Sequence, residues 1–128
     1  MVRAVKKRAL LAAVTIALPL ALGAASYVVR ARLPLVVRGH FADGAWGFAL
    51  GAFVALVWMN EKRSARALWL AGAASFAAIL ECLQYAHIVR GVFDPVDLVV
   101  ETSAVLVAAC IVGVIGGMNR WTLASEAR

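Results

Sequence analysis

The sequence of 128 residues is 64% hydrophobic and only 16% charged, a balance that a water-soluble domain of this size could hardly keep in solution. Because a bilayer core of ~30 Å takes ~20 helical residues to cross, four spans with short connections nearly exhaust the length. The net charge of +6 does not indicate nucleic-acid binding, since the basic residues flank apolar runs instead of lining one soluble face. We therefore predict an all-α integral membrane bundle of four transmembrane helices in a single domain.

The first predicted span covers residues 9–29, an apolar run without a charged residue that follows the basic residues 6–8. A cleavable signal peptide is the alternative, because small residues surround Gly23 and Pro19 could end the helix early. We expect the helix to be retained, since the apolar character continues past the small residues. Cleavage would leave three spans and the same orientation of the C-terminus.

The second predicted span covers residues 42–59 and the third covers residues 67–89, with a short basic loop between them. Asp43 is the charged residue of the second span and lies close to its start. Gly47 and Gly51 in this span, like Gly113 and Gly117 near the end of the chain, have a spacing that allows another helix to approach closely. In an apolar chain rich in glycine such spacing also arises easily by chance.

The fourth predicted span covers residues 95–118 and has a well-formed start. Asp94 can cap the helix, Pro95 suits its first position, and Asp97 faces the positive end of the helix dipole.

The distribution of basic residues predicts that both termini are cytoplasmic. The flanks assigned to the cytoplasm hold nine of the 13 basic residues: Arg3, Lys6, Lys7, Arg8, Lys62, Arg63, Arg66, Arg120 and Arg128. The outer side holds the other four: Arg30, Arg32, Arg38 and Arg90. Three of these precede the second span and need an explanation other than topology. Trp58, Trp69 and Trp121 fall together at the inner boundary, as an aromatic belt would.

Acidic side chains gather at the outer ends of the spans in this orientation. Five of the seven belong to this group: Asp43, Glu81, Asp94, Asp97 and Glu101. Charged groups within lipid are costly, so Glu81 and Glu101 should face the bundle interior. Antiparallel packing puts Glu81 about level with Ser103, so the two glutamates are expected to share a pocket.

Helical spacing places the polar residues of each span on one face. These faces carry Asp43 with Trp46, Glu81 with Gln84, and Asp97 with Glu101. We expect them to converge on a cavity that opens outward, with acids at its base and cations at its mouth. The candidate cations are Arg38, His40, His87 and Arg90.

Structural roles compete with this interpretation. Asp94 and Asp97 are explained by helix capping, His87 by an interfacial hydrogen bond, and Gln84 by a contact between helices. Glu81 is the residue that such roles explain least. Metal binding is not favoured, because no helix carries a Glu-x-x-His or His-x-x-x-His pair. We predict no catalytic residue, metal or cofactor.

Several of these residues form a recognisable pattern. They are Asp43 and Trp46, the segment Glu81-Cys82-Leu83-Gln84, and the segment Arg90-Gly91-Val92-Phe93-Asp94-Pro95-Val96-Asp97-Leu98. The pattern resembles the VanZ-like family of small membrane proteins over roughly residues 38–117, and residues 101–104 depart from it. The resemblance implies a multi-pass protein of the bacterial cytoplasmic membrane. The family's name-giving member is associated with glycopeptide antibiotic resistance, and most relatives lack an assigned reaction.

The leading functional hypothesis is a non-enzymatic envelope protein that binds an anionic lipid headgroup, a lipid-linked precursor or an antibiotic-like ligand. Arg38 and Arg90 would hold phosphate through charge-assisted hydrogen bonds. One alternative is a small proton-coupled carrier in which Glu81 and Glu101 exchange a proton. Another is a structural or accessory subunit without a ligand. The expected partners are membrane lipids, with a second copy or another membrane protein left open, and no nucleic acid.

Reporter fusions test the topology. We expect a reporter fused after Arg128 to show a cytoplasmic location, because most basic flanking residues lie on that side. Labelling of a cysteine introduced near Arg128 by a reagent that cannot cross the membrane would contradict the orientation. The N-terminal sequence of the mature protein shows whether the first span is kept.

Overall fold

The computed structural model describes residues 9–90 and 93–126. Four helices in these ranges are long and apolar enough to cross a membrane: Ala9–Val28, Val37–Val57, Arg63–Tyr85 and Pro95–Gly116. The described ranges contain no strand, so the predicted all-α membrane bundle of four helices is confirmed.

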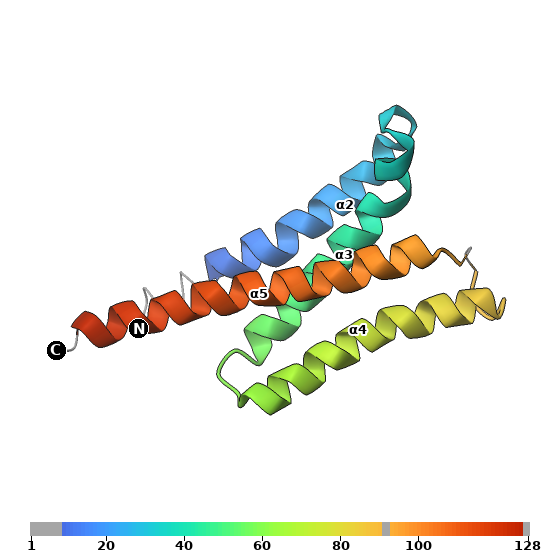
Figure 1. Cartoon of the computed structure of the whole chain (residues 1–128). Helices are drawn as coiled ribbons and strands as arrows, with labels where there is room; N and C mark the ends of the chain where they lie inside the picture. Colours follow the sequence, from blue (N-terminus) through green and yellow to red (C-terminus); the bar gives the residue numbers. More distant parts are fainter. Residues whose placement is uncertain (1–8, 91–92, 127–128) are drawn as a thin grey trace.

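Successive helices run back and forth along the bundle (Figure 1). The connection between the first two spans and the connection between the last two therefore lie at one end. We call this end, which carries residues 29–34 and the described part of residues 86–94, the acidic end. The loop at residues 58–62 lies at the opposite end.

The first helix widens before it reaches Pro19. A π-helical segment, Ala13–Ala17 (η1), is followed by α2, Leu18–Val28. Proline cannot donate the usual backbone hydrogen bond, and a π-bulge lets a helix continue past such a gap. The buried Thr15 hydroxyl donates to the Leu11 carbonyl at 2.7 Å in this segment. Pro19 therefore does not end the helix early.

A short 3₁₀ turn, Arg30–Arg32 (η2), leads into α3, Leu35–Val57. Pro34 precedes α3 with an extended backbone (φ −54°, ψ 149°), which suits a residue just before a helix. The helix thus starts well before residue 42, the predicted start of the second span. Arg38 consequently lies in the first turns of α3.

The next helix, α4, covers Arg63–Tyr85 and ends before residue 89, the predicted end of the third span. His87 has a positive φ of 58°. Its N–H donates to the Gln84 carbonyl at 3.0 Å, and the Ile88 N–H donates to the Leu83 carbonyl at 2.9 Å. This is a Schellman motif, with His87 in the left-handed position that glycine usually occupies.

The last helix, α5, covers Pro95–Glu126 and continues beyond residue 118. The Val96 N–H donates to Asp94 Oδ1 at 2.8 Å, so the predicted cap by Asp94 is confirmed. The rings of Tyr85 and Phe93 meet edge to face at 5.5 Å across the connection from α4.

Small residues bring the α3 and α5 backbones together. A Cβ on Gly47 would lie 2.6 Å from the Glu101 carbonyl oxygen, and one on Gly51 would lie 2.7 Å from Val105 Cα. Real Cβ atoms do not approach backbone so closely. The close approach that this spacing allows therefore occurs at Gly47 and Gly51, with α5 as the partner. At Gly113 a Cβ would meet nothing within 4 Å, so that glycine makes no such contact.

The buried core continues this contact along α3 and α5. One cluster consists of Ala52, Ala55, Ala108 and Val112, and a second consists of Val54, Ala73 and Val105. The α2 helix packs on the other side of α3, where a Cβ on Gly23 would meet Ala45 Cβ at 3.1 Å. The α4 helix contributes Ala73 and Glu81 to the buried side chains described.

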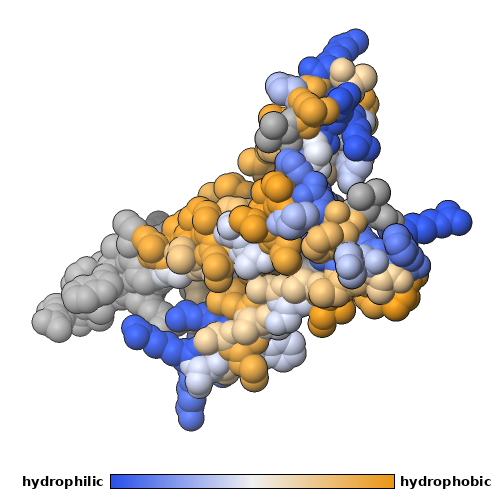
Figure 2. All heavy atoms as spheres, turned by 45° about the vertical axis from the view of Figure 1, so that its right-hand side comes forward, coloured by the Kyte–Doolittle hydropathy of each residue, from blue (hydrophilic) through white to orange (hydrophobic). Residues whose placement is uncertain are grey.

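Hydrophobic and hydrophilic residues are distributed over the surface as in a membrane protein. Figure 2 shows hydrophobic atoms across the middle of the bundle and hydrophilic atoms toward its ends. The rings of Trp58 and Trp69 stack at 4.3 Å beside the loop at residues 58–62, where an aromatic belt was predicted. The side chain of Trp121 lies outside the part that the structure describes.

Two alanine substitutions test the contact between α3 and α5. Gly51→Ala should destabilise the protein by about 1–3 kcal/mol, because the new methyl group forces two backbones apart. Gly72→Ala on α4 is the matched control, since a Cβ there meets nothing within 4 Å and alanine favours a helix. Thermal unfolding in detergent measures both. Equal stability of Gly51→Ala and the unmodified protein would contradict the packing.

Candidate ligand-binding site

Two adjoining cavities lie between the helices, one along the middle of the bundle and one toward the acidic end. The larger has a volume of about 470 Å³, and we call it the apolar cavity. Its lining is mostly hydrophobic and includes Leu20 of α2, Phe53 of α3 and Phe76 of α4. Trp46 and Glu101 also line it, so the two glutamates expected to share a pocket, Glu81 and Glu101, do so.

The smaller cavity has a volume of about 320 Å³, and we call it the polar cavity. It lies nearer the tip of the acidic end, between Ser26, Tyr27 and Arg30 at the end of the first span and Arg38 at the start of α3. Asp97 of α5 lines it as well. This cavity therefore has basic and acidic side chains in its wall.

Three polar residues belong to both cavities and form the seam between them. They are Asp43 of α3 and Glu81 and Gln84 of α4. Asp43 lies one helical turn from Gly47, where α3 touches α5, and Glu81 lies in the penultimate turn of α4. The polar faces of α3 and α4 thus meet at the seam, and α5 adds Glu101 to the apolar cavity and Asp97 to the polar one. The predicted convergence of the three faces on a shared cavity region therefore occurs.

Glu81 joins α4 to the start of α5. Its side chain is buried, with 7% of the residue exposed, and its Oε2 accepts a hydrogen bond from the Asp94 N–H at 3.2 Å. A carboxylate at this place also faces the positive end of the α5 dipole. The sequence predicted Glu81 about level with Ser103, whereas the structure places it beside Asp94, nearer the connection between α4 and α5. The reason is that α4 ends at Tyr85, earlier than predicted.

His40 and Asp97 form the polar contact between α3 and α5. The Nδ1 atom of His40 is hydrogen-bonded to Oδ1 of Asp97, and both side chains are about four-fifths buried (22% and 21% exposed). Hydrogen bonds to an ionised carboxylate are stronger than neutral ones. Asp97 is thus held by the protein itself while one edge of it lines the polar cavity.

Three residues near the acidic end carry atoms of the kind that bind metal ions. His40, Asp94 and Asp97 offer atoms that all lie within 4.8 Å of one another. Nitrogen and oxygen donors of this kind suit zinc or manganese. In the structure Asp97 is bonded to His40, and Asp94 caps α5. Each of the three side chains thus already makes a hydrogen bond within the protein.

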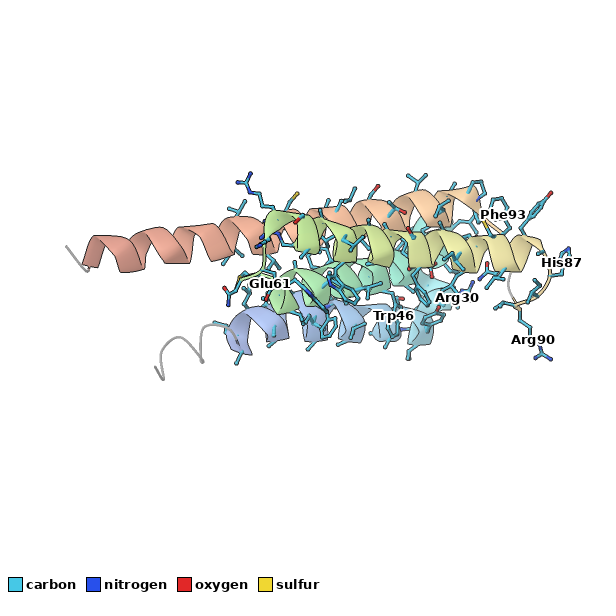
Figure 3. The ribbon with its side chains drawn as sticks, turned by 90° about the horizontal axis from the view of Figure 1, so that it is seen from below. Arg30, Trp46, Glu61, His87, Arg90 and Phe93 are labelled. Carbon is cyan, nitrogen blue, oxygen red and sulfur yellow. The ribbon has the colours of Figure 1, made fainter. Side chains whose placement is uncertain are left out.

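Three of the predicted site residues, His87, Arg90 and Asp94, are not part of either cavity wall. His87 and Arg90 are exposed and point away from the bundle beyond the end of α4 (Figure 3). His87 ends the helix, and Arg90 is not part of either cavity wall. Asp94 acts through its cap and its backbone contact with Glu81.

The remaining predicted residues come together. Arg38, Asp43, Trp46, Glu81, Gln84, Asp97 and Glu101 line one or both cavities. Sequence reasoning did not include Ser26, Tyr27 and Arg30, which complete the polar cavity. The available signal was the group of arginines before the second span that topology did not explain.

Comparison of the chain with protein-family models, with curated proteins and with solved structures gives no match.

Substitutions of Glu81 test its contact with α5. Glu81→Gln keeps an acceptor oxygen for the Asp94 N–H and should stay nearly as stable as the unmodified protein. Glu81→Ala removes the acceptor and leaves a cavity, which should cost about 2 kcal/mol or more. The free energy of unfolding in detergent distinguishes the variants. If both are as stable as the unmodified protein, the bond from α4 to α5 contributes nothing.

Proposed function

We propose that this protein binds an anionic amphiphile of the cell envelope at the acidic end of the bundle. The ligand is a lipid headgroup with its chain, a lipid-linked precursor or an antibiotic-like molecule of similar chemistry. The observation that carries the proposal is the pair of cavities, one apolar and one polar, joined at Asp43, Glu81 and Gln84. A molecule with an apolar part and a charged part matches such a pair.

The arginines of the polar cavity supply the anion contact. Within the part of the chain that the structure describes, the ion pair formed at this end is His40 with Asp97, and neither Arg30 nor Arg38 is paired with a carboxylate. Both guanidinium groups are therefore available to a phosphate or another anion, which they can contact in a bidentate manner. Their place at the tip of the bundle suits the headgroup region of a bilayer.

The apolar cavity is accessible from the side of the bundle. Trp46, Phe53 and Phe76 line it, yet they are 60%, 50% and 54% exposed. In a membrane such side chains border the lipid acyl chains. A ligand already dissolved in the bilayer could therefore move its chain between α2 and α4 without leaving the membrane.

We further propose that the protein is a VanZ-like protein of the bacterial cytoplasmic membrane, with the acidic end on the outer side. The residues that carry this resemblance include Asp43, Trp46, Glu81, Gln84 and Asp97, all of which line the cavities. A link to antibiotic tolerance would follow from binding of an envelope precursor.

The other functional hypotheses gain less support. A proton-coupled carrier needs a polar path across the membrane, whereas the deeper wall of the apolar cavity consists of residues such as Ile16, Leu20 and Phe53. A purely structural subunit needs no cavity beside its charged residues. Neither hypothesis uses the arginines of the polar cavity.

Binding measurements on arginine variants test the proposal. Replacing both Arg30 and Arg38 by alanine should weaken binding of phosphatidylglycerol by about tenfold or more, since each lost charge-assisted bond is worth about 1.5–3 kcal/mol. Arg90→Ala is the matched control, because Arg90 is exposed and outside both cavities. Affinity is measured by titration of the detergent-solubilised protein. Equal affinity for all three proteins would overturn the proposal.

A further inference from the structure

The groups that face the ligand have a fixed order along the bundle axis. Along α3 toward the acidic end, the order of these groups is Phe53, Trp46, Asp43 and Arg38. A helix rises 1.5 Å per residue, so Arg38 lies roughly 7 Å beyond Asp43. The seam carboxylates thus separate the apolar cavity from the arginines.

This order along the axis determines which chemical group of the ligand can lie beside Asp43. A chain in the apolar cavity and a phosphate beside Arg30 and Arg38 must be joined by a segment that passes Asp43. A carboxylate accepts hydrogen bonds and repels phosphate, so the part of the joining segment that passes Asp43 binds best when it presents a hydrogen-bond donor. A fully esterified glycerol has no donor there, whereas a glycerol with one free hydroxyl does.

The other seam carboxylate is already engaged. Glu81 accepts the Asp94 N–H, and the neighbouring Asp97 is bonded to His40. Glu81 is also buried, whereas Asp43 is only partly buried, so Asp43 is the seam carboxylate that a ligand can reach more easily.

We propose that the occupant is a lysophospholipid, a single-chain phospholipid whose free glycerol hydroxyl donates to Asp43. Its acyl chain fills the apolar cavity and its phosphate contacts Arg30 and Arg38. This inference rests on the proposed function and narrows it to one ligand class. One chain also suits the space, because the second cavity is lined by polar side chains and would not favour a second chain.

Three lipids with the same phosphate monoester test the free hydroxyl and the single chain separately. Lysophosphatidic acid carries one chain and the free hydroxyl. Its analogue on a propanediol backbone carries one chain and no hydroxyl, and phosphatidic acid carries two chains and no hydroxyl. We expect the detergent-solubilised full-length protein to bind lysophosphatidic acid at least about tenfold more tightly than either of the others.

A variant ties the preference to Asp43. In Asp43→Leu the ratio of affinities for lysophosphatidic acid and its analogue should fall to about one, because the acceptor is gone. Arg90→Ala should keep the ratio of the unmodified protein. Each ratio is read within a single protein, so a partial loss of folded material affects both ligands equally.

The outcomes distinguish the two proposals. Equal binding of lysophosphatidic acid and its hydroxyl-free analogue would overturn the role of Asp43, and equal binding of phosphatidic acid would overturn the single-chain ligand. In both cases the broader proposal of an anionic lipid site would stand. Binding of none of the three lipids, and none of phosphatidylglycerol, would overturn the proposed function itself.

Discussion

The close approach of α3 to α5 at Gly47 and Gly51 determines where every group of the site lies. Because these glycines lie against the backbone at Glu101 and Val105, the two helices can neither slide nor rotate without a steric clash. Glu101 therefore faces Gly47, and Asp43 follows one turn toward the acidic end. The hydrogen bond between His40 and Asp97 lies further along the same contact between α3 and α5 and has the same register. In lipid, where apolar side chains gain little by leaving their surroundings, such contacts specify the structure more than hydrophobic burial does.

The α4 helix is positioned differently, by polar atoms at its end. Most of its large apolar side chains, such as Leu68, Phe76 and Ile79, are exposed, and its buried side chains are Ala73 and Glu81 among those described. The bond from the Asp94 N–H to Glu81 fixes the distance between the end of α4 and the start of α5. A chain bound in the apolar cavity would contact the α4 side that carries Phe76, so a ligand would add packing where the protein alone supplies little.

The sequence was sufficient for the four helices and for most of the polar side chains that line the cavities, because these follow from apolar runs and helical periodicity. The spacing of Gly47 and Gly51 allowed a close contact without showing that one forms, since Gly113 has the same spacing to Gly117 and makes none. It was not sufficient for the end of α4. That end depends on His87 adopting a left-handed backbone, which histidine does rarely and which no spacing rule signals. Nor did it place Arg30 in the wall or Arg90 outside it. The first span is apolar on every side, so its periodicity does not show which face packs on α3, and the position of Arg30 follows from that packing.

The two kinds of charge at the acidic end would be expected to neutralise each other, yet the protein keeps them apart. Asp97 is bonded to His40 and Glu81 to the backbone of α5, so both carboxylates have partners that are not arginines. If they were paired with Arg30 or Arg38 instead, an incoming phosphate would have to break those ion pairs before it could bind. The loss of the ion pairs would then offset much of the free energy of phosphate binding. With these two carboxylates already engaged, the arginines remain at the mouth of the polar cavity with unused donors. The histidine and the cap of α5 thus contribute to anion binding without touching the ligand, by removing the acids that would compete with it.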